Sequence, residues 1–131
     1  MDLKVEYITN ITEEDIEDIV VTAIEGGIGY WCCLDNTNET YENAPDDEPI
    51  AITAAKIILR GNKIKLIDEC DGGTEYELGL EELLAGISTW KSCGYDTYEA
   101  ITLKGVDCTM IDACGADGIF QCATIGDITY G

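Results

Sequence analysis

Residues 11–27 read ITEEDIEDIVVTAIEGG, and this stretch decides how the fold begins. Thr12 is typical of a helix N-cap, and Asp15 three residues later is suited to a capping box. Acidic residues at 13–15 occupy the first turn, where the helix dipole favours negative charge. The double glycine at 26–27 predicts a left-handed end to the helix. Between these limits the apolar residues recur at helical spacing and form one stripe: Ile16, Ile19, Val20, Ala23 and Ile24.

The rest of the chain alternates strand-like and helix-like patterns around this first helix. Strands are expected at residues 2–8, at 28–34, at 63–67, at 74–78, within 98–103 and at 128–130. Further helices are expected at 50–60, at 80–90 and from Asp112 to Gly126. This order indicates a single α+β domain over 1–131, with a mixed or antiparallel sheet covered by about three to four helices.

Residues 35–49 read DNTNETYENAPDDEP and interrupt the regular patterns with a polar, acidic loop rich in turn residues. Its start hints at a calcium loop, but Thr37 and Thr40 stand where a ligand and the sixth-position glycine belong. We therefore expect a contact loop or insertion here and no metal site.

Charge is the most extreme property of the chain. It contains 27 Asp and Glu against 7 Lys and Arg, a formal net charge of −20. Such a charge repels phosphate backbones and anionic lipids, so we expect no direct binding of nucleic acid or of a membrane. The distribution is uneven, because a basic island without acidic residues interrupts it at Lys56, Arg60, Lys63 and Lys65.

The residues that usually carry catalysis are missing or badly placed. Histidine is absent, and the seven cysteines show no C-x-x-C spacing that would suit a zinc site. An acidic field raises thiol pKa values, which disfavours a nucleophilic cysteine. The chain is charged from its start, unlike a signal peptide, so we expect a cytoplasmic protein with reduced thiols in a bacterial host cell. The sequence predicts neither an enzyme nor a bound cofactor.

Three blocks of sequence carry a resemblance to a known group of proteins: ITEEDIEDIVVTAIEGGIGYWC at 11–32, YELGLEELLAGI at 76–87 and IDACGADGIFQCATIGDITYG at 111–131. Together they resemble uncharacterised small acidic proteins of phages and mobile elements of gut Firmicutes. The resemblance implies a genomic setting in which small proteins often inhibit host defence, including anti-CRISPR proteins of the type II-A kind that bind Cas effectors. It supplies no catalytic residues, and it does not cover residues 35–60.

The leading hypothesis is a phage or mobile-element anti-defence protein. It would be a non-catalytic, DNA-mimic-like inhibitor that binds a basic, nucleic-acid-handling host protein such as a Cas nuclease. Carboxylates on successive helical turns lie about 5.4 Å apart, close to the spacing of phosphates along a strand. The residues expected to contact the partner are Glu13, Glu14, Glu17, Asp18, Asp46, Asp47 and Glu48.

Two alternatives stay open at the level of sequence. One is a small-ligand sponge that sequesters a nucleotide immune signal, with the basic island on the phosphates and Trp31 or Tyr76 stacked on the base. The other is a structural or accessory phage domain, with a homodimer as one form, whose charge serves only solubility.

Overall fold

The computed structural model describes residues 9–131, so the strand expected at 2–8 lies outside the described residues. The first helix, α1 (Glu13–Thr22), begins as the sequence predicts. The Thr12 hydroxyl accepts from the Asp15 N–H at 3.1 Å, and the Asp15 carboxylate accepts from the Thr12 N–H at 3.0 Å. This capping box satisfies two of the free N–H groups at the helix start.

The predicted left-handed end of α1 is wrong. The helix continues into a π-helical turn, η1 (Ala23–Gly27), and neither glycine of the pair has a positive φ. Close packing explains Gly27 instead, because a Cβ there would lie 2.8 Å from the carbonyl oxygen of Ala113. The glycine lets α5 approach η1.

The remaining elements include those predicted at 28–34, 50–60, 63–67, 74–78, 80–90, 98–103 and from Asp112, with shifted ends, and three that were not predicted, at 39–42, 105–106 and 108–110. The helices are α2 (Glu39–Glu42), α3 (Ile50–Leu59), α4 (Leu80–Ser92), the 3₁₀ helix η2 (Cys108–Met110) and α5 (Ala113–Thr124). The strands are β1 (Cys32–Asp35), β2 (Ile64–Asp68), β3 (Thr74–Leu78), β4 (Ile101–Thr102) and β5 (Gly105–Val106). The α+β class is confirmed, and within 9–131 the short α2 inside the acidic loop brings the α-helices to five.

The sheet is antiparallel throughout. Strands β1, β2 and β3 lie in that order, with Cys32 opposite Asp68 and Leu66 opposite Tyr76, while β4 and β5 form a separate hairpin. The strand expected at 128–130 is wrong, because those residues form no strand. The N–H groups of Thr129 and Tyr130 donate instead to a side chain of α5, and that of Ile128 donates to Asp127, so all three are satisfied without a neighbouring strand.

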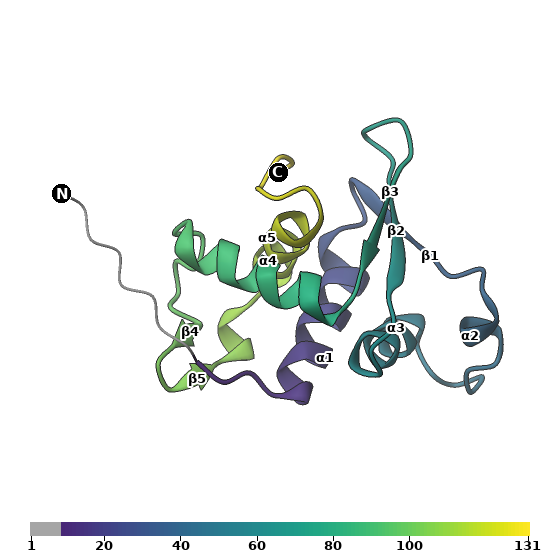
Figure 1. Ribbon diagram of the computed structural model, residues 1–131, viewed down its shortest axis with the longest axis horizontal. Helices are drawn as coiled ribbons and strands as arrows, with labels where there is room; N and C mark the ends of the chain where they lie inside the picture. Colours follow the sequence, from purple (N-terminus) through teal and green to yellow (C-terminus); the bar gives the residue numbers. More distant parts are fainter. Residues whose placement is uncertain (1–8) are drawn as a thin grey trace.

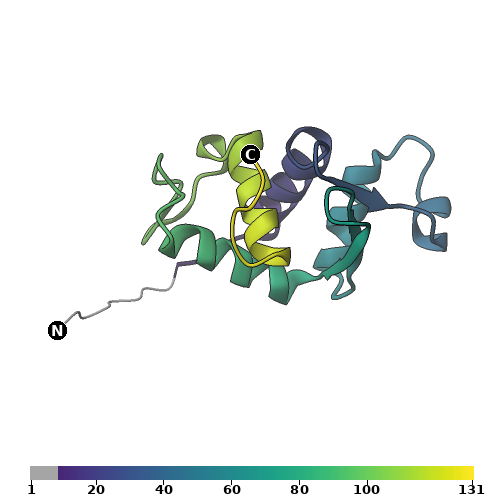
Figure 2. The ribbon, with the colours of Figure 1, turned by 90° about the horizontal axis from the view of Figure 1, so that it is seen from above.

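Helices α1, α4 and α5 gather on one side of the molecule, and the three-stranded sheet lies with α3 on the other (Figures 1 and 2). Helices α3 and α5 contact the sheet. The core is continuous, and its largest fully buried side chains include Trp31, Phe120 and Leu66. Across 9–131, no helix combines the length and the apolar character needed to cross a membrane.

Candidate interaction surface

The outer face of α1 carries the first set of predicted contact residues. Glu13, Glu14 and Asp18 are exposed, and Glu17 is half-buried. None of these four carboxylates takes part in an ion pair within the described part of the chain. Their spacing makes like-charge pairs one turn apart, each of which costs roughly 0.2–0.5 kcal/mol of helix stability. The face therefore holds concentrated negative charge without neutralising partners.

An open hollow of about 420 Å³ lies between this helix and the segment that leads from β5 into η2. Its lining contains four carboxylates and no basic side chain: Glu14, Asp15, Asp18, Thr22, Val106, Asp107, Cys108 and Thr109. Asp107 was not among the predicted contact residues, because only the fold brings residue 107 beside α1. The hollow extends the negative surface of α1 sideways.

Cys108 fixes the wall of this hollow. Its thiol contacts the backbone carbonyl oxygen of Asp15 at 3.6 Å and the Asp15 carboxylate at 3.5 Å. Burial, followed by the charge of Asp15, raises the pKa of Cys108 to about 12. The thiol is therefore protonated at neutral pH and serves as a weak hydrogen-bond donor rather than a nucleophile.

The second set of predicted contact residues lies on the loop between α2 and α3. Asp46 and Asp47 are exposed. Glu48 behaves differently, because its carboxylate contacts the Lys56 ammonium and accepts a hydrogen bond of 2.7 Å from the Thr53 hydroxyl. These two bonds, with Lys56 the larger influence, lower the pKa of Glu48. Glu48 therefore fastens the loop to α3.

The two predicted sets do not lie together. Helix α3 stands between α1 and the loop that carries Asp46 and Asp47 (Figures 1 and 2). The structure therefore reduces the seven predicted contact residues to one coherent group on α1 and two separate exposed acids.

The basic island is largely neutralised by nearby acids. Besides the pair of Lys56 with Glu48, the Lys63 ammonium lies 2.5 Å from Glu82, and the Lys65 ammonium lies 3.9 Å from Glu75. The hydrogen bond that the Lys63 ammonium donates to Glu82 raises the pKa of Lys63. Arg60 follows the last residue of α3 and is exposed. Phosphate groups would have to compete with carboxylates already in place.

Of the two aromatic residues proposed to stack on a base, Trp31 is not available for that role. Trp31 is fully buried, its ring stacks on Tyr130 at a centroid distance of 5.3 Å, and its Nε1 donates to Asp117 at 2.7 Å. Tyr76 is half-buried on β3. The structure does not bring Trp31 to the surface beside the basic island.

Sequence reasoning missed a buried polar network centred on Asp117. Its carboxylate accepts from the Tyr30 hydroxyl at 2.5 Å, from Trp31 and from the Gln121 side-chain amide at 3.1 Å. Burial, followed by the hydrogen bond to Asp117, raises the pKa of Tyr30 to about 12, so this hydroxyl remains a donor. A signal was present in the sequence, since Asp117 and Gln121 stand one turn apart on the buried side of an apolar helix.

The same network also binds the backbone of residues 129 and 130. The Gln121 side-chain oxygen accepts from the N–H groups of Thr129 and Tyr130 at 2.7 and 2.8 Å. The Tyr130 hydroxyl then donates to Asp68 on β2 at 2.9 Å. These contacts connect α5, the chain end and the sheet, so we assign the network to stability rather than to binding.

Searches of the chain against protein-family models, curated proteins and solved structures gave no match. Among the described residues, no three Cys, Asp or Glu side chains are grouped so as to hold a metal ion.

Proposed function

We propose that this protein is a non-catalytic anti-defence inhibitor of a phage or mobile element. It binds a basic, nucleic-acid-handling host protein, such as a Cas nuclease, through the acidic face of α1. One observation carries the proposal: Glu13, Glu14 and Asp18 are exposed, Glu17 is half-buried, and none of the four has a cationic partner among residues 9–131. They border a hollow lined by further carboxylates. The lysines at 56, 63 and 65 contact other acids instead.

The arrangement on α1 suits imitation of a polyanion. Glu14 and Asp18 stand one helical turn apart, as do Glu13 and Glu17, and one turn advances about 5.4 Å along the axis. A groove that evolved to hold phosphates can accept these carboxylates and release its own counterions. Such binding weakens steeply as salt concentration rises.

The cysteines support a non-catalytic role. Burial is the main cause that raises the pKa of Cys32 to about 12 and that of Cys122 to about 11. Acidic neighbours raise both values further, as they do for Cys108. Since the chain also has no histidine, these thiols have neither a base nor a positive neighbourhood to activate them.

Direct binding to a purified type II-A Cas9 across a salt series tests the proposal. We expect saturable one-to-one binding that weakens as salt rises, and we expect the Cas9 to lose DNA binding in proportion. A variant with Glu39, Glu42, Glu77 and Glu81 changed to Gln supplies the matched control, because it removes equal charge away from α1. Absence of binding to this and other purified defence nucleases, or binding indifferent to salt, would overturn the proposal.

A further inference from the structure

The segment from Gly94 to Met110 exposes apolar side chains in places where turn chemistry does not require them. Tyr98 is 68% exposed and Leu103 is 71% exposed, more than any other large apolar residue within 9–131. Leu103 and Lys104 form the two-residue connection between β4 and β5, where Asn and Gly are the usual choices. A leucine at the tip of a tight turn contributes neither to the turn nor to the core.

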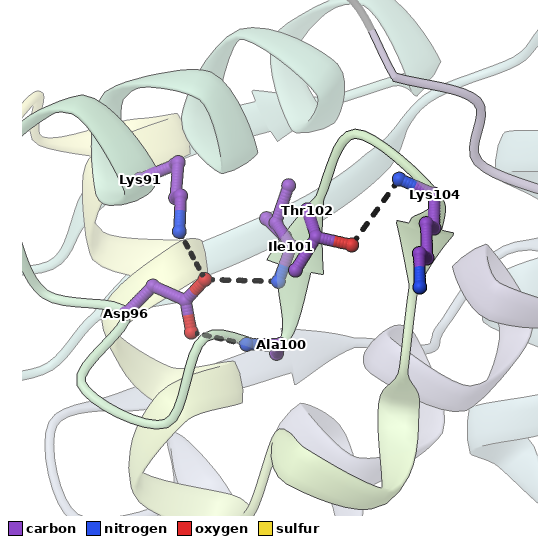
Figure 3. Close-up of polar contacts among 6 residues, drawn as sticks. All are labelled: Lys91, Asp96, Ala100, Ile101, Thr102 and Lys104. Carbon is purple, nitrogen blue, oxygen red and sulfur yellow. Dashed lines mark hydrogen bonds and ion pairs between the residues drawn. The ribbon is translucent and has the colours of Figure 1, made fainter.

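A buried carboxylate holds this segment in one shape (Figure 3). Asp96 accepts from the N–H of Ala100 at 2.8 Å and from the N–H of Ile101 at 2.9 Å, and it pairs with Lys91 of α4 at 3.1 Å. Burial alone would raise the pKa of Asp96, but these three partners outweigh burial and lower it. The loop before β4 is therefore anchored to α4.

The same loop stores backbone strain. Glu99 has a φ of 54°, and it is the only residue other than glycine with a positive φ among the described residues. Strain of this kind is found at binding sites, where the surrounding structure holds it in place. Here the Asp96 bonds hold the residues that follow Glu99, so Tyr98 is presented from a fixed backbone.

The exposed segment continues directly into the wall of the acidic hollow. Strand β5 ends at Val106, and the residues from there to Thr109 line the hollow opposite Glu14 and Asp18 of α1. The hairpin also lies against the residues before α1, since a Cβ on Gly105 would lie 3.6 Å from the carbonyl oxygen of Asn10. The hairpin therefore lies beside the residues that precede α1, and the chain runs from it directly into the wall of the hollow.

We propose that Tyr98 and Leu103, which stand before and after β4, supply the apolar contacts of the binding surface whose acidic part is α1. This inference rests on the proposed function and specifies its partner: a protein segment that presents an apolar stripe flanked by lysine and arginine. An apolar centre with a charged rim is the usual composition of a protein–protein interface.

Charge complementarity favours a basic protein segment over the other possible partners of this surface. An anionic membrane would be repelled by Glu99, Asp107 and the carboxylates of α1. A second copy of the chain would bring another net charge of −20 to the same contact. A nucleic acid would also be repelled, through its phosphates, and it has no apolar stripe that could contact Leu103. A basic, amphipathic protein segment satisfies both parts of the surface.

Two synthetic helical peptides with identical lysine and arginine content test the inference. One carries leucine at i, i+3, i+4 and i+7, and the other carries serine at those positions. Calorimetry at low and moderate salt gives the affinities, and amide NMR shifts locate the contact. We expect the leucine peptide to bind the intact chain about tenfold more tightly than the serine peptide, with shifts at 98–109.

A double variant, Tyr98→Ser with Leu103→Ser, should lose that preference while it retains the salt-dependent binding of both peptides. The control changes two exposed apolar residues elsewhere, Ile50→Ser with Leu84→Ser, and should keep the preference. Equal binding of the two peptides to the intact chain, or a preference that survives the double variant, overturns this inference and leaves the proposed function standing. Absence of salt-dependent binding of either peptide overturns both.

Discussion

The outer face of α1 and the junction of α5 with the sheet both concentrate carboxylates, and they use them in opposite ways. On α1 the carboxylates of Glu13, Glu14 and Asp18 are exposed and that of Glu17 is half-buried, and none has a cationic partner among the described residues. At the junction Asp68 and Asp117 are almost completely buried, and each accepts hydrogen bonds from neighbouring donors. A carboxylate with several donors stabilises the fold, whereas one without partners is available to an outside cation.

This difference shows that composition alone cannot assign a role to an acidic residue. The net charge of the chain, −20, does not distinguish the two regions. Burial and the number of donors separate them, and both quantities depend on which segments the fold brings together. Stability and binding, measured on the same variants, should respond differently in the two regions.

The largest expected effect is on stability, from Asp117→Ala. The change removes the acceptor of Trp31 Nε1 and of the Tyr30 hydroxyl, and one of the acceptors of the Gln121 amide. This loss should cost about 3 kcal/mol in the free energy of unfolding. Urea denaturation measures this loss. Glu25→Ala, at an exposed position of η1, is the control and should change stability by less than about 0.5 kcal/mol. Equal stability of the two variants would contradict the assignment of Asp117 to the structural network.

The next effect is on binding, from neutralising the face of α1 with Glu13→Gln, Glu14→Gln, Glu17→Gln and Asp18→Asn. We expect about a thirtyfold loss of affinity for a cationic partner at low salt, because four charge contacts disappear. Stability should change by less than about 0.5 kcal/mol, because relief of the like-charge pairs is offset by the loss of negative charge from the first turn of the helix. A matched loss of affinity in the Glu39, Glu42, Glu77 and Glu81 control would mean that total charge, rather than α1, governs binding.

A smaller effect is expected in alkaline solution, where the junction should weaken. The pKa of Tyr30 and of Tyr130 is raised to about 12, in both cases chiefly by burial and then by the neighbouring aspartate. A raised pKa means that the contribution to stability is complete below the unfolded-state value of 10.0 and disappears as pH rises through 12.

Unfolding of the intact chain and of Tyr130→Phe, followed from pH 8 to 12, checks this account. The variant should be less stable at neutral pH, because Asp68 loses a donor, and its stability should depend less on pH above 10. Tyr98→Phe is the control, since that ring is exposed. A variant whose alkaline profile matches that of the intact chain would remove Tyr130 from the network.

The smallest effect is expected from nucleotides, which should leave thermal stability unchanged. Three lysines of the basic island are already paired with acids, and Trp31 is buried. A thermal-shift screen with cyclic and ADP-ribose nucleotides measures this. The variant Glu48→Gln with Glu82→Gln frees Lys56 and Lys63 from their acidic partners. It serves as the comparison, because its lysines are available to a nucleotide phosphate. A shift of more than about 2 °C in the intact chain would restore the ligand-sponge alternative.

Local signals predicted the elements well where one short stretch contains the whole cause. The capping box at Thr12 and Asp15 formed as expected, as did the strands predicted at 63–67 and 74–78 and the helix predicted to begin at Asp112, with at most small shifts at their ends. Each depends on contacts within a few residues, which a sequence displays directly.

Prediction from the sequence failed where a local structure is determined by residues that are distant along the chain. Gly27 is required by Ala113, some 86 positions later, rather than by a left-handed turn. The residues at 128–130 have a strand-like pattern, but Gln121 binds their backbone in place of a strand. The paired state of Glu48 and the burial of Trp31 are likewise products of packing, so the candidate site could be predicted only in its α1 part.

Competition with DNA tests the central claim most directly. A type II-A Cas9 is saturated with a labelled DNA duplex at low salt, and the intact chain or the α1-neutralised variant is titrated in. The account predicts that the intact chain displaces the DNA completely and competitively, while the neutralised variant requires a much higher concentration. A stable complex that holds both the chain and the DNA at once would contradict the claim that the face of α1 imitates a nucleic acid.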